Sequence, residues 1–472
     1  MRHPRIHLRH SLVLLCFFLV QLPVGIPAET SAPLKETFSF PASVPLPAVL
    51  DLKTAQRLAL QGNPSLEAAQ ARAAQAREKV RQAWSRYLPR LEGSASASRV
   101  KPAENQGRDF PISGFSSITS GTIPTAREDV YRAGLNATLT LFDGFHREFT
   151  LAAARFNEQG SQAAYREAQR VLLSAVADSY FLAQLARQRR IIAQADEAFN
   201  DRQLKDAQAR EALGVGSLSD VLNFQVQANL ARAQKIQADQ EERVALTGLA
   251  ALMGLPEGTL NEHTSLAPLE EPDPALLQVP SVQEALDDAL KYRPDLKQAR
   301  FALKAAQALV KSTQSRFSPS LNLFGTVEGS RTNDASMEQD DFGSSVGVAM
   351  VVPLFSGGED FFRVREAQQF QREAQKVLHQ VRIDAAKEVQ EAVAQILGAQ
   401  EQFRLQKENA ALVQKTRDLV EKEYAVGQAS LVRLTQAQRD LVQAQSQLAQ
   451  SRIALENAWV RLRAATGRIL ED

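Results

Sequence analysis

The chain contains two copies of one pattern, and this direct repeat limits its possible folds more than any other feature. In the early part of each copy, a shift of 230 residues aligns the stretch around Pro64 with the stretch around Pro294. In the later part, a smaller shift of 213 residues, called the late shift below, aligns LFDG at 141–144 with LFSG at 354–357. A collinear set of matches across both halves indicates a duplication. Each structural element is therefore expected twice.

Each copy is predicted to contain a proline-broken helix, two strands and a long helical hairpin. Helical patterns cover 51–88 and 281–318 and are interrupted at the two aligned prolines, which remove a backbone donor. Alternation with a period of two follows, with the same phase in both copies, as burial of one sheet face requires. The predicted strands cover 91–98, 133–141, 321–328 and 346–354.

Two long segments, 145–212 and 358–426, contain no proline and only three glycines between them. At ~1.5 Å per residue, each would form a helix ~100 Å long. Apolar residues recur at three-to-four spacing, which is typical of coiled coils. Turns at 214–217 and 427–430 are predicted to fold each long helix back onto a second helix of about 37 residues.

Composition and charge exclude several function classes. Of the 472 residues, 55 are Lys or Arg and 54 are Asp or Glu, so there is no bias toward binding nucleic acid. One cysteine, Cys16, excludes a disulfide scaffold, and six histidines make a histidine-rich metal enzyme a poor hypothesis. HExxH and phosphate-loop motifs are absent from the sequence. We therefore predict no catalytic, cofactor-binding or metal site, and a protein that is not an enzyme.

The segment 1–28 is predicted to be a signal peptide. Arg2, Arg5 and Arg9 precede an apolar run of nine residues, and Ala28 offers a small residue for cleavage. Nine residues are too few to cross a bilayer, which needs about 20. The alternative is a short buried N-terminal helix. No later apolar run is long enough to span a bilayer, so no transmembrane helix is predicted.

The predicted domain organisation follows from the repeat. It comprises a signal peptide at 1–28, an N-terminal extended segment at 29–50, a first repeat at 51–254, a Pro-rich equatorial linker at 255–280 and a second repeat at 281–468.

Four strands are too few to close a barrel in a membrane. The smallest such barrels have about eight strands, and open strand edges are not tolerated in lipid. If the alternating strands span a membrane, two, three or four copies of the chain must combine. An ordinary antiparallel sheet packed on one side is the alternative, and the strands alone do not decide.

Several segments together carry a resemblance to a known family. They are NPSLEAAQ (63–70), LFDG (141–144), VPLFSGG (352–358), GVGSLSDVLNFQ (214–225) and VGQASLVRLTQAQ (426–438). Over nearly all of 49–468 the chain resembles TolC-type outer-membrane efflux proteins. The resemblance implies a mainly α fold with a small transmembrane β-barrel. Three copies would form a tunnel, an α-barrel of coiled-coil hairpins topped by a 12-strand barrel with four strands per chain.

The same resemblance implies a function and partners. The protein would be a passive conduit of a tripartite efflux or type I secretion system, located in the outer membrane with its tunnel in the periplasm. It would carry drugs, small molecules, ions or proteins. Its partners would be two further copies, a periplasmic adaptor (membrane fusion) protein, an inner-membrane RND or ABC-type pump, and outer-membrane lipid. The alternative is a structural periplasmic adaptor or tether, but such a protein would have one hairpin and many flanking strands.

The resemblance also implies two sets of site residues. The hairpin tips, with Gly214, Ser217, Gly427 and Ser430, would meet the adaptor. The periplasmic aperture would include Asp220, Tyr424, Arg433 and Gln436.

The family carries acidic residues at the aperture where this chain has Arg433 and Gln436. The late shift pairs Arg433 with Asp220, so three copies could present an alternating ring of charges, with Tyr424 donating to Asp220. A solvated helix face is the alternative interpretation. Separately, Asp334, Glu338, Asp340 and Asp341 form an acidic loop, for which a weak cation site and a solvated loop both remain open.

Overall fold

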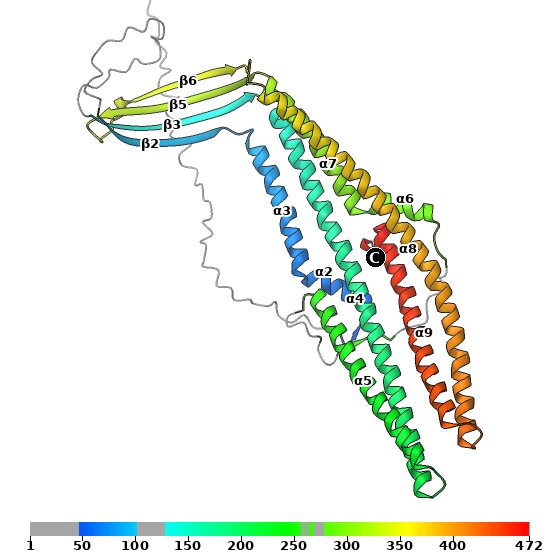
Figure 1. The fold of residues 1–472 in the computed structure, drawn as a ribbon. Coiled ribbons are helices and arrows are strands. Elements are labelled where there is room, and N and C mark those ends of the chain that lie inside the picture. The colour runs from blue at the N-terminus through cyan, green and yellow to red at the C-terminus, as the bar shows by residue number, and fades with distance from the viewer. Residues whose placement is uncertain (1–46, 102–127, 256–259, 261–263, 269–277, 472) are drawn as a thin grey trace, which may run out of the picture. The chain divides into compact units, whose positions relative to one another are not determined.

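The helices of the two copies begin at residues related by the shifts that the sequence predicts. In the computed structural model, α2 (Leu52–Gly62) recurs as α6 (Val282–Tyr292), and α4 (His146–Ala212) recurs as α8 (Glu359–Ala425) (Figure 1). The structure describes residues 47–101, 128–255, 260, 264–268 and 278–471, which belong to one unit. The predicted signal peptide lies outside these residues, and the division into domains stays a prediction.

The proline-broken helices form as predicted. Helix α2 ends at Gly62 and α3 (Pro64–Ser85) begins at the next proline; α6 ends at Tyr292 and α7 (Pro294–Gln314) begins likewise. Proline at a first helical position loses no hydrogen bond, because that donor has no partner within a helix. Asn63 fixes the first junction, since its side chain accepts from Ser65 N (2.9 Å) and donates to Leu252 O (2.8 Å).

Four strands form one antiparallel sheet in the order β2-β3-β5-β6. They are β2 (Arg90–Val100), β3 (Glu128–Phe142), β5 (Ser320–Thr332) and β6 (Phe342–Val351). In register, Asn136 on β3 lies opposite Thr326 on β5, so the two copies meet at the centre of the sheet. Strands β2 and β6 are left as edges. The prediction that the last strand reaches Leu354 is wrong: it ends at Val351, and Pro353 cannot donate to a ladder.

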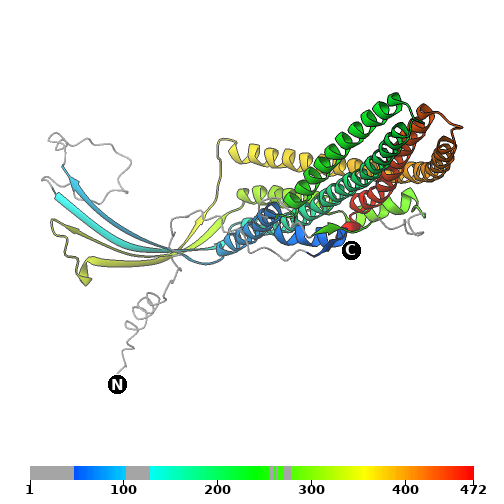
Figure 2. The same cartoon turned by 90° about the horizontal axis from the view of Figure 1, so that it is seen from below.

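The long helices form two hairpins. Helices α4 and α8 each contain 67 residues and fold back onto α5 (Leu218–Leu252) and α9 (Leu431–Thr466). Helix α9 packs against α4 as well as α8, so the two hairpins adjoin within one chain (Figures 1 and 2). Small residues allow this close packing: Ala228, Ala437 and Ala444 are buried on α5 and α9.

Two very short strands were not predicted. β1 (Val49–Leu50) pairs in parallel with β4 (Ser265–Leu266), joining the start of the first copy to the linker. Helix α4 holds β1 and the residue that follows β4: Tyr180 Oη donates to Leu50 O (3.3 Å) and Gln184 Nε2 donates to Ala267 O (2.8 Å). The described residues also contain the 3₁₀ turns η3 (Ser315–Phe317), η4 (Gln339–Asp341) and η5 (Arg468–Leu470). Among the described residues, no helix combines the length and the apolar character needed to cross a bilayer.

Candidate functional site: the hairpin tips

Both hairpin tips reverse through the same backbone motif. At the first tip, Gly214 N donates to Glu211 O (2.8 Å) and Val215 N to Arg210 O (3.0 Å). At the second, Gly427 N donates to Tyr424 O (3.0 Å) and Gln428 N to Glu423 O (2.8 Å). This pair of bonds is the Schellman helix end, which requires a left-handed residue. Gly214 and Gly427 supply it, with φ of 73° and 76°.

The two serines predicted at the tips begin the return helices. Ser217 accepts a hydrogen bond from Ser219 N (3.1 Å), and Ser430 accepts one from Arg433 N (3.3 Å). Each side chain thus satisfies a donor that has no partner within its helix. The sequence GxxS is therefore explained locally by one helix ending and another beginning.

The tips also expose apolar side chains, which the sequence reasoning missed. Leu213 is 79% exposed and Val215 76% at the first tip, while Val426 is 70% and Val432 73% exposed at the second. A Cβ added at Gly214 or Gly427 would meet nothing within 4 Å. Polar side chains are the usual choice in a solvated turn, so valine and leucine in these turns were the available sequence signal.

Two of the four predicted aperture residues lie near each other between the tips. Tyr424 is half-buried; its ring meets Phe224 edge-on at 6.2 Å, and the Arg210 guanidinium lies 5.6 Å from its centroid. Burial, followed by the charge of Asp220, raises the pKa of the Tyr424 hydroxyl. The carboxylate of Asp220 on α5 therefore acts electrostatically on the Tyr424 hydroxyl at the end of α8.

The other two predicted aperture residues have partners within their own hairpin. Arg433 is exposed and pairs with Glu423 at 3.1 Å, and Gln436 donates to Asp440 at 2.8 Å. Neither contact involves Asp220. The alternating ring between copies of the chain stays a prediction, and within one chain Arg433 pairs with Glu423.

Above the tips, the two hairpins are joined by an apolar cluster and a polar clasp. Phe199, Phe224 and Leu434 are each at most 3% exposed and belong to three different helices. Beside them, Gln438 of α9 donates to the carboxylate of Asp196 on α4 (2.7 Å), and both residues are buried. Burial raises the pKa of Asp196, although the bond from Gln438 opposes this shift.

The acidic loop contains a cation of its own. Arg331 lies 3.9, 3.3 and 3.5 Å from the carboxylates of Asp334, Glu338 and Asp341. No group of acidic or histidine side chains suited to a metal occurs among the residues that the structure describes. Pairing with Arg331 therefore accounts for the clustering of Asp334, Glu338 and Asp341 in this loop.

Comparison with protein families gives a match over most of the chain. The family model described as "Outer membrane efflux protein" matches residues 56–255 and 285–468, one segment in each copy of the repeat.

Individual relatives agree with this match. Outer membrane efflux protein BepC of Brucella suis biovar 1 is 27% identical, over 84% of this chain and 80% of that protein. Alkaline protease secretion protein AprF of Pseudomonas aeruginosa is 28% identical, over 89% and 84%. The solved structure of the outer membrane protein VceC from Vibrio cholerae has the same fold. Its TM-score is 0.72 at 21% identity, with coverage of 88% of this chain and 96% of that chain.

Proposed function

This chain belongs to the outer membrane efflux protein family, and from that premise we propose that three copies enclose one passive conduit. It is an outer-membrane channel of a tripartite efflux or type I secretion system, with its helical part in the periplasm. The proposal goes further: each chain supplies four strands to a 12-strand barrel and two hairpins to the tunnel wall. Members of the family are channels, and we assign no catalytic step or cofactor.

The open sheet is the observation that carries this proposal. Strand order β2-β3-β5-β6 leaves an edge on each side, and each edge belongs to a different copy of the repeat. An open edge in lipid leaves backbone groups without partners, at several kcal/mol each. Because β3 already pairs with β5 inside the chain, the equivalent pairing outside it is β6 with β2 of the next chain. The two open edges support closure of several chains into a ring, and the family resemblance supplies the number three.

The long helices support the same closure. Exposed leucines recur along α8 at a spacing of seven residues, with Leu405 50%, Leu412 58% and Leu419 59% exposed. Helix α5 has exposed apolar residues too, including Leu222 and Val226. A heptad stripe of this kind is typical of a helix that lacks its coiled-coil partner. We assign α8 of one chain to the α5 edge of the next.

The tips are proposed as the adaptor-docking surface. Exposed valine and leucine beside Gly214, Ser217, Gly427 and Ser430 give an apolar end to each hairpin. Apolar patches with polar surroundings mark protein interaction sites. An adaptor would carry the substrate from an inner-membrane RND or ABC-type pump. The related proteins are named for the export of different cargoes, a protease in AprF and pyoverdine in OpmQ, so the pump is proposed to select the substrate.

Planar-bilayer conductance tests the proposed conduit and its aperture. We expect the protein, purified from the outer-membrane fraction, to conduct ions. We expect Asp220→Asn to raise the open probability, because it weakens the electrostatic interaction between residue 220 and the Tyr424 hydroxyl. Arg433→Gln should do the same only if Arg433 reaches Asp220 of a neighbouring chain. In that case the exchange Asp220→Arg with Arg433→Asp should restore closure. A soluble monomer without conductance would instead favour a periplasmic tether.

A further inference from the structure

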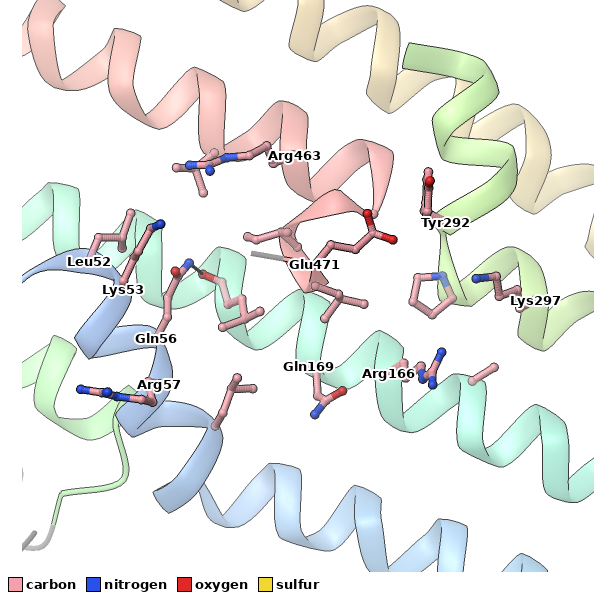
Figure 3. Close-up of a pocket in the computed structure, with 18 of the residues that line it drawn as sticks. Leu52, Lys53, Gln56, Arg57, Arg166, Gln169, Tyr292, Lys297, Arg463 and Glu471 are labelled. Atoms are coloured by element: carbon pink, nitrogen blue, oxygen red, sulfur yellow. Dashed lines mark hydrogen bonds between the residues drawn. The ribbon is translucent and has the colours of Figure 1, made fainter. Parts of the chain in front are cut away.

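A cavity lies between the two copies, beside the first half of α4. Its volume is about 1490 Å³, and it is lined by α2, α4, the α6–α7 junction, the end of α9 and η5 (Figure 3). Helices α3, α5 and α8 and the edge strands contribute no lining residue. Association of copies through those edges therefore leaves the cavity accessible.

The cavity wall is rich in cationic side chains that lack salt bridges. Lys53, Arg57, Arg166 and Lys297 line it, from three different segments of the chain, and the described residues hold no salt-bridge partner for any of the four. Arg463 adds a fifth positive charge, against three lining carboxylates at Asp51, Glu456 and Glu471. Figure 3 shows Lys53, Arg166, Arg463 and Lys297 placed around the space. The net positive charge is local, because the whole chain is close to neutral.

The repeat provides an internal comparison for these charges. The same shifts that align the helices pair Lys53 with Gln283, Arg57 with Asp287, Arg166 with His379, Lys297 with Glu67 and Arg463 with Ala250. No lysine or arginine occurs at any of the five equivalent positions. Since both copies build the same helices, the fold does not require cations there. Lys53, Arg57 and Arg166 are exposed and Lys297 is half-buried, so an anionic ligand can reach all four side chains.

The position of the cavity restricts the source of the anion. The lining residues of α4 extend from Gln159 to Leu173, whereas the helix begins at His146, just after the sheet. At ~1.5 Å per residue this places them ~20–40 Å along the helix from the strands, too far for a lipid headgroup. A second helical layer inside a conduit would obstruct it, so α2 and η5 must lie on its outer surface. This step rests on the proposed function.

We propose that the cavity binds carboxylate-bearing peptides of the cell-wall peptidoglycan, which any periplasmic tunnel must pass. The stem peptides of this polymer carry closely spaced carboxylates, which lysine and arginine bind by charge-assisted hydrogen bonds. The volume exceeds that of sites for drug-sized ligands, ~300–1000 Å³, and fits a short peptide. The contact would fasten the channel to the wall without touching the tips or the aperture.

Co-sedimentation with purified peptidoglycan sacculi, together with calorimetry using a free stem tetrapeptide, tests this site on the full-length protein in detergent. The quadruple variant Lys53→Gln, Arg57→Gln, Arg166→Gln, Lys297→Gln should bind about tenfold or more weakly at low salt. The matched control removes four cations outside the cavity: Arg72→Gln, Lys79→Gln, Arg202→Gln, Lys205→Gln. It should bind within about twofold of the wild type, which would exclude a general charge effect.

Further readouts separate this site from the proposed function. Conductance and oligomeric state should be unchanged in both quadruple variants, so a failure of the conduit would be visible independently. Should the quadruple variant fail to assemble, Lys297→Glu alone introduces the residue that the other copy carries at Glu67 and should still weaken binding. Equal binding by all variants, or no binding by the wild type, would overturn the proposal. So would binding of inorganic phosphate without binding of the tetrapeptide.

Discussion

At the scale of single residues, Asp196 is the most informative position. Its carboxylate is buried between α4 and α9, and only amide groups, from Gln438 and Asn200, oppose the effect of burial on its pKa. Oε1 of Gln438 is buried and has no hydrogen-bond partner among the described residues. The repeat equivalent of Asp196 is Asn409, so the fold accepts an amide here.

We expect Asp196→Asn to increase stability at neutral pH and to lose this advantage in acid. The folded pKa is raised above the ordinary value of 3.8, so the ionised group destabilises the folded protein. That penalty is absent below 3.8, grows as the pH rises through the raised folded pKa, and is complete above it. Thermal unfolding of variant and wild type over this pH range measures the difference. Asp178→Asn is the control: Asp178 pairs with Arg461 at 3.0 Å and is half-exposed, so no such gain should appear. A constant difference between variant and wild type at all pH values would show that the pKa of Asp196 is the same in the folded and unfolded protein.

Gly427 separates the local role of a tip residue from a docking role. Its φ of 76° is strained for most side chains by about 1–2 kcal/mol, but asparagine tolerates this region. Gly427→Leu should therefore disturb the turn, whereas Gly427→Asn should keep it and add a side chain to open space. If the tip docks an adaptor, both variants should lose export while still reaching the outer membrane. Normal export by Gly427→Asn would mean that the glycine only makes the turn.

At the scale of elements, the repeat explains why one stripe of α8 is exposed. The late shift pairs Leu412 with Phe199, which is 3% exposed where the two hairpins of one chain meet. Leu412 is 58% exposed. It should occupy, between chains, the place that Phe199 occupies within one.

Alanine substitutions at this pair should therefore have different consequences. Truncation of a truly exposed leucine changes stability by about 0.5 kcal/mol or less, whereas truncation of a buried one costs about 2–5 kcal/mol. We expect Leu412→Ala to dissociate the oligomer at a lower temperature on semi-native gels and to leave the helical circular dichroism of the chain intact. Phe199→Ala should lower both the dissociation temperature of the oligomer and the helical circular dichroism of the chain. An unchanged dissociation temperature for Leu412→Ala would place the α8 stripe in solvent.

The sequence was sufficient for the periodic elements and insufficient for the contacts between distant ones. Helix bounds could be predicted because prolines, glycines and serine caps recur at fixed shifts, as at Pro64 and Pro294. β1 and β4 were missed because two-residue strands have no periodicity. The Arg433–Glu423 pair was missed because a helix end and the next helix start come together only in three dimensions. The Asp196–Gln438 clasp joins residues 242 positions apart, and no local pattern marks it.

At the scale of the whole molecule, the duplication gives one chain two different sheet edges, β2 and β6, and we propose that they pair with each other between chains. A contact between unlike surfaces repeats until a ring closes or a filament forms. The internal β3–β5 pairing then predicts the register between chains. Asn136 opposite Thr326 becomes Ala349 opposite Ser96 of the next chain, and Leu135 opposite Val327 becomes Val348 opposite Ala97.

Disulfide trapping of this register tests the central claim, a closed ring of three chains, most directly. The only native cysteine, Cys16, lies in the predicted signal peptide. Two double variants, Ala349→Cys with Ser96→Cys and Val348→Cys with Ala97→Cys, cover both kinds of antiparallel pair. The control, Ala349→Cys with Glu92→Cys, shifts one cysteine by four residues, ~13 Å, beyond the ~7 Å that a disulfide spans between Cα atoms. On non-reducing denaturing gels of outer membranes we expect covalent trimers from at least one matched pair and monomers from the control. Monomers throughout, or covalent dimers as the largest product, would contradict the three-chain ring.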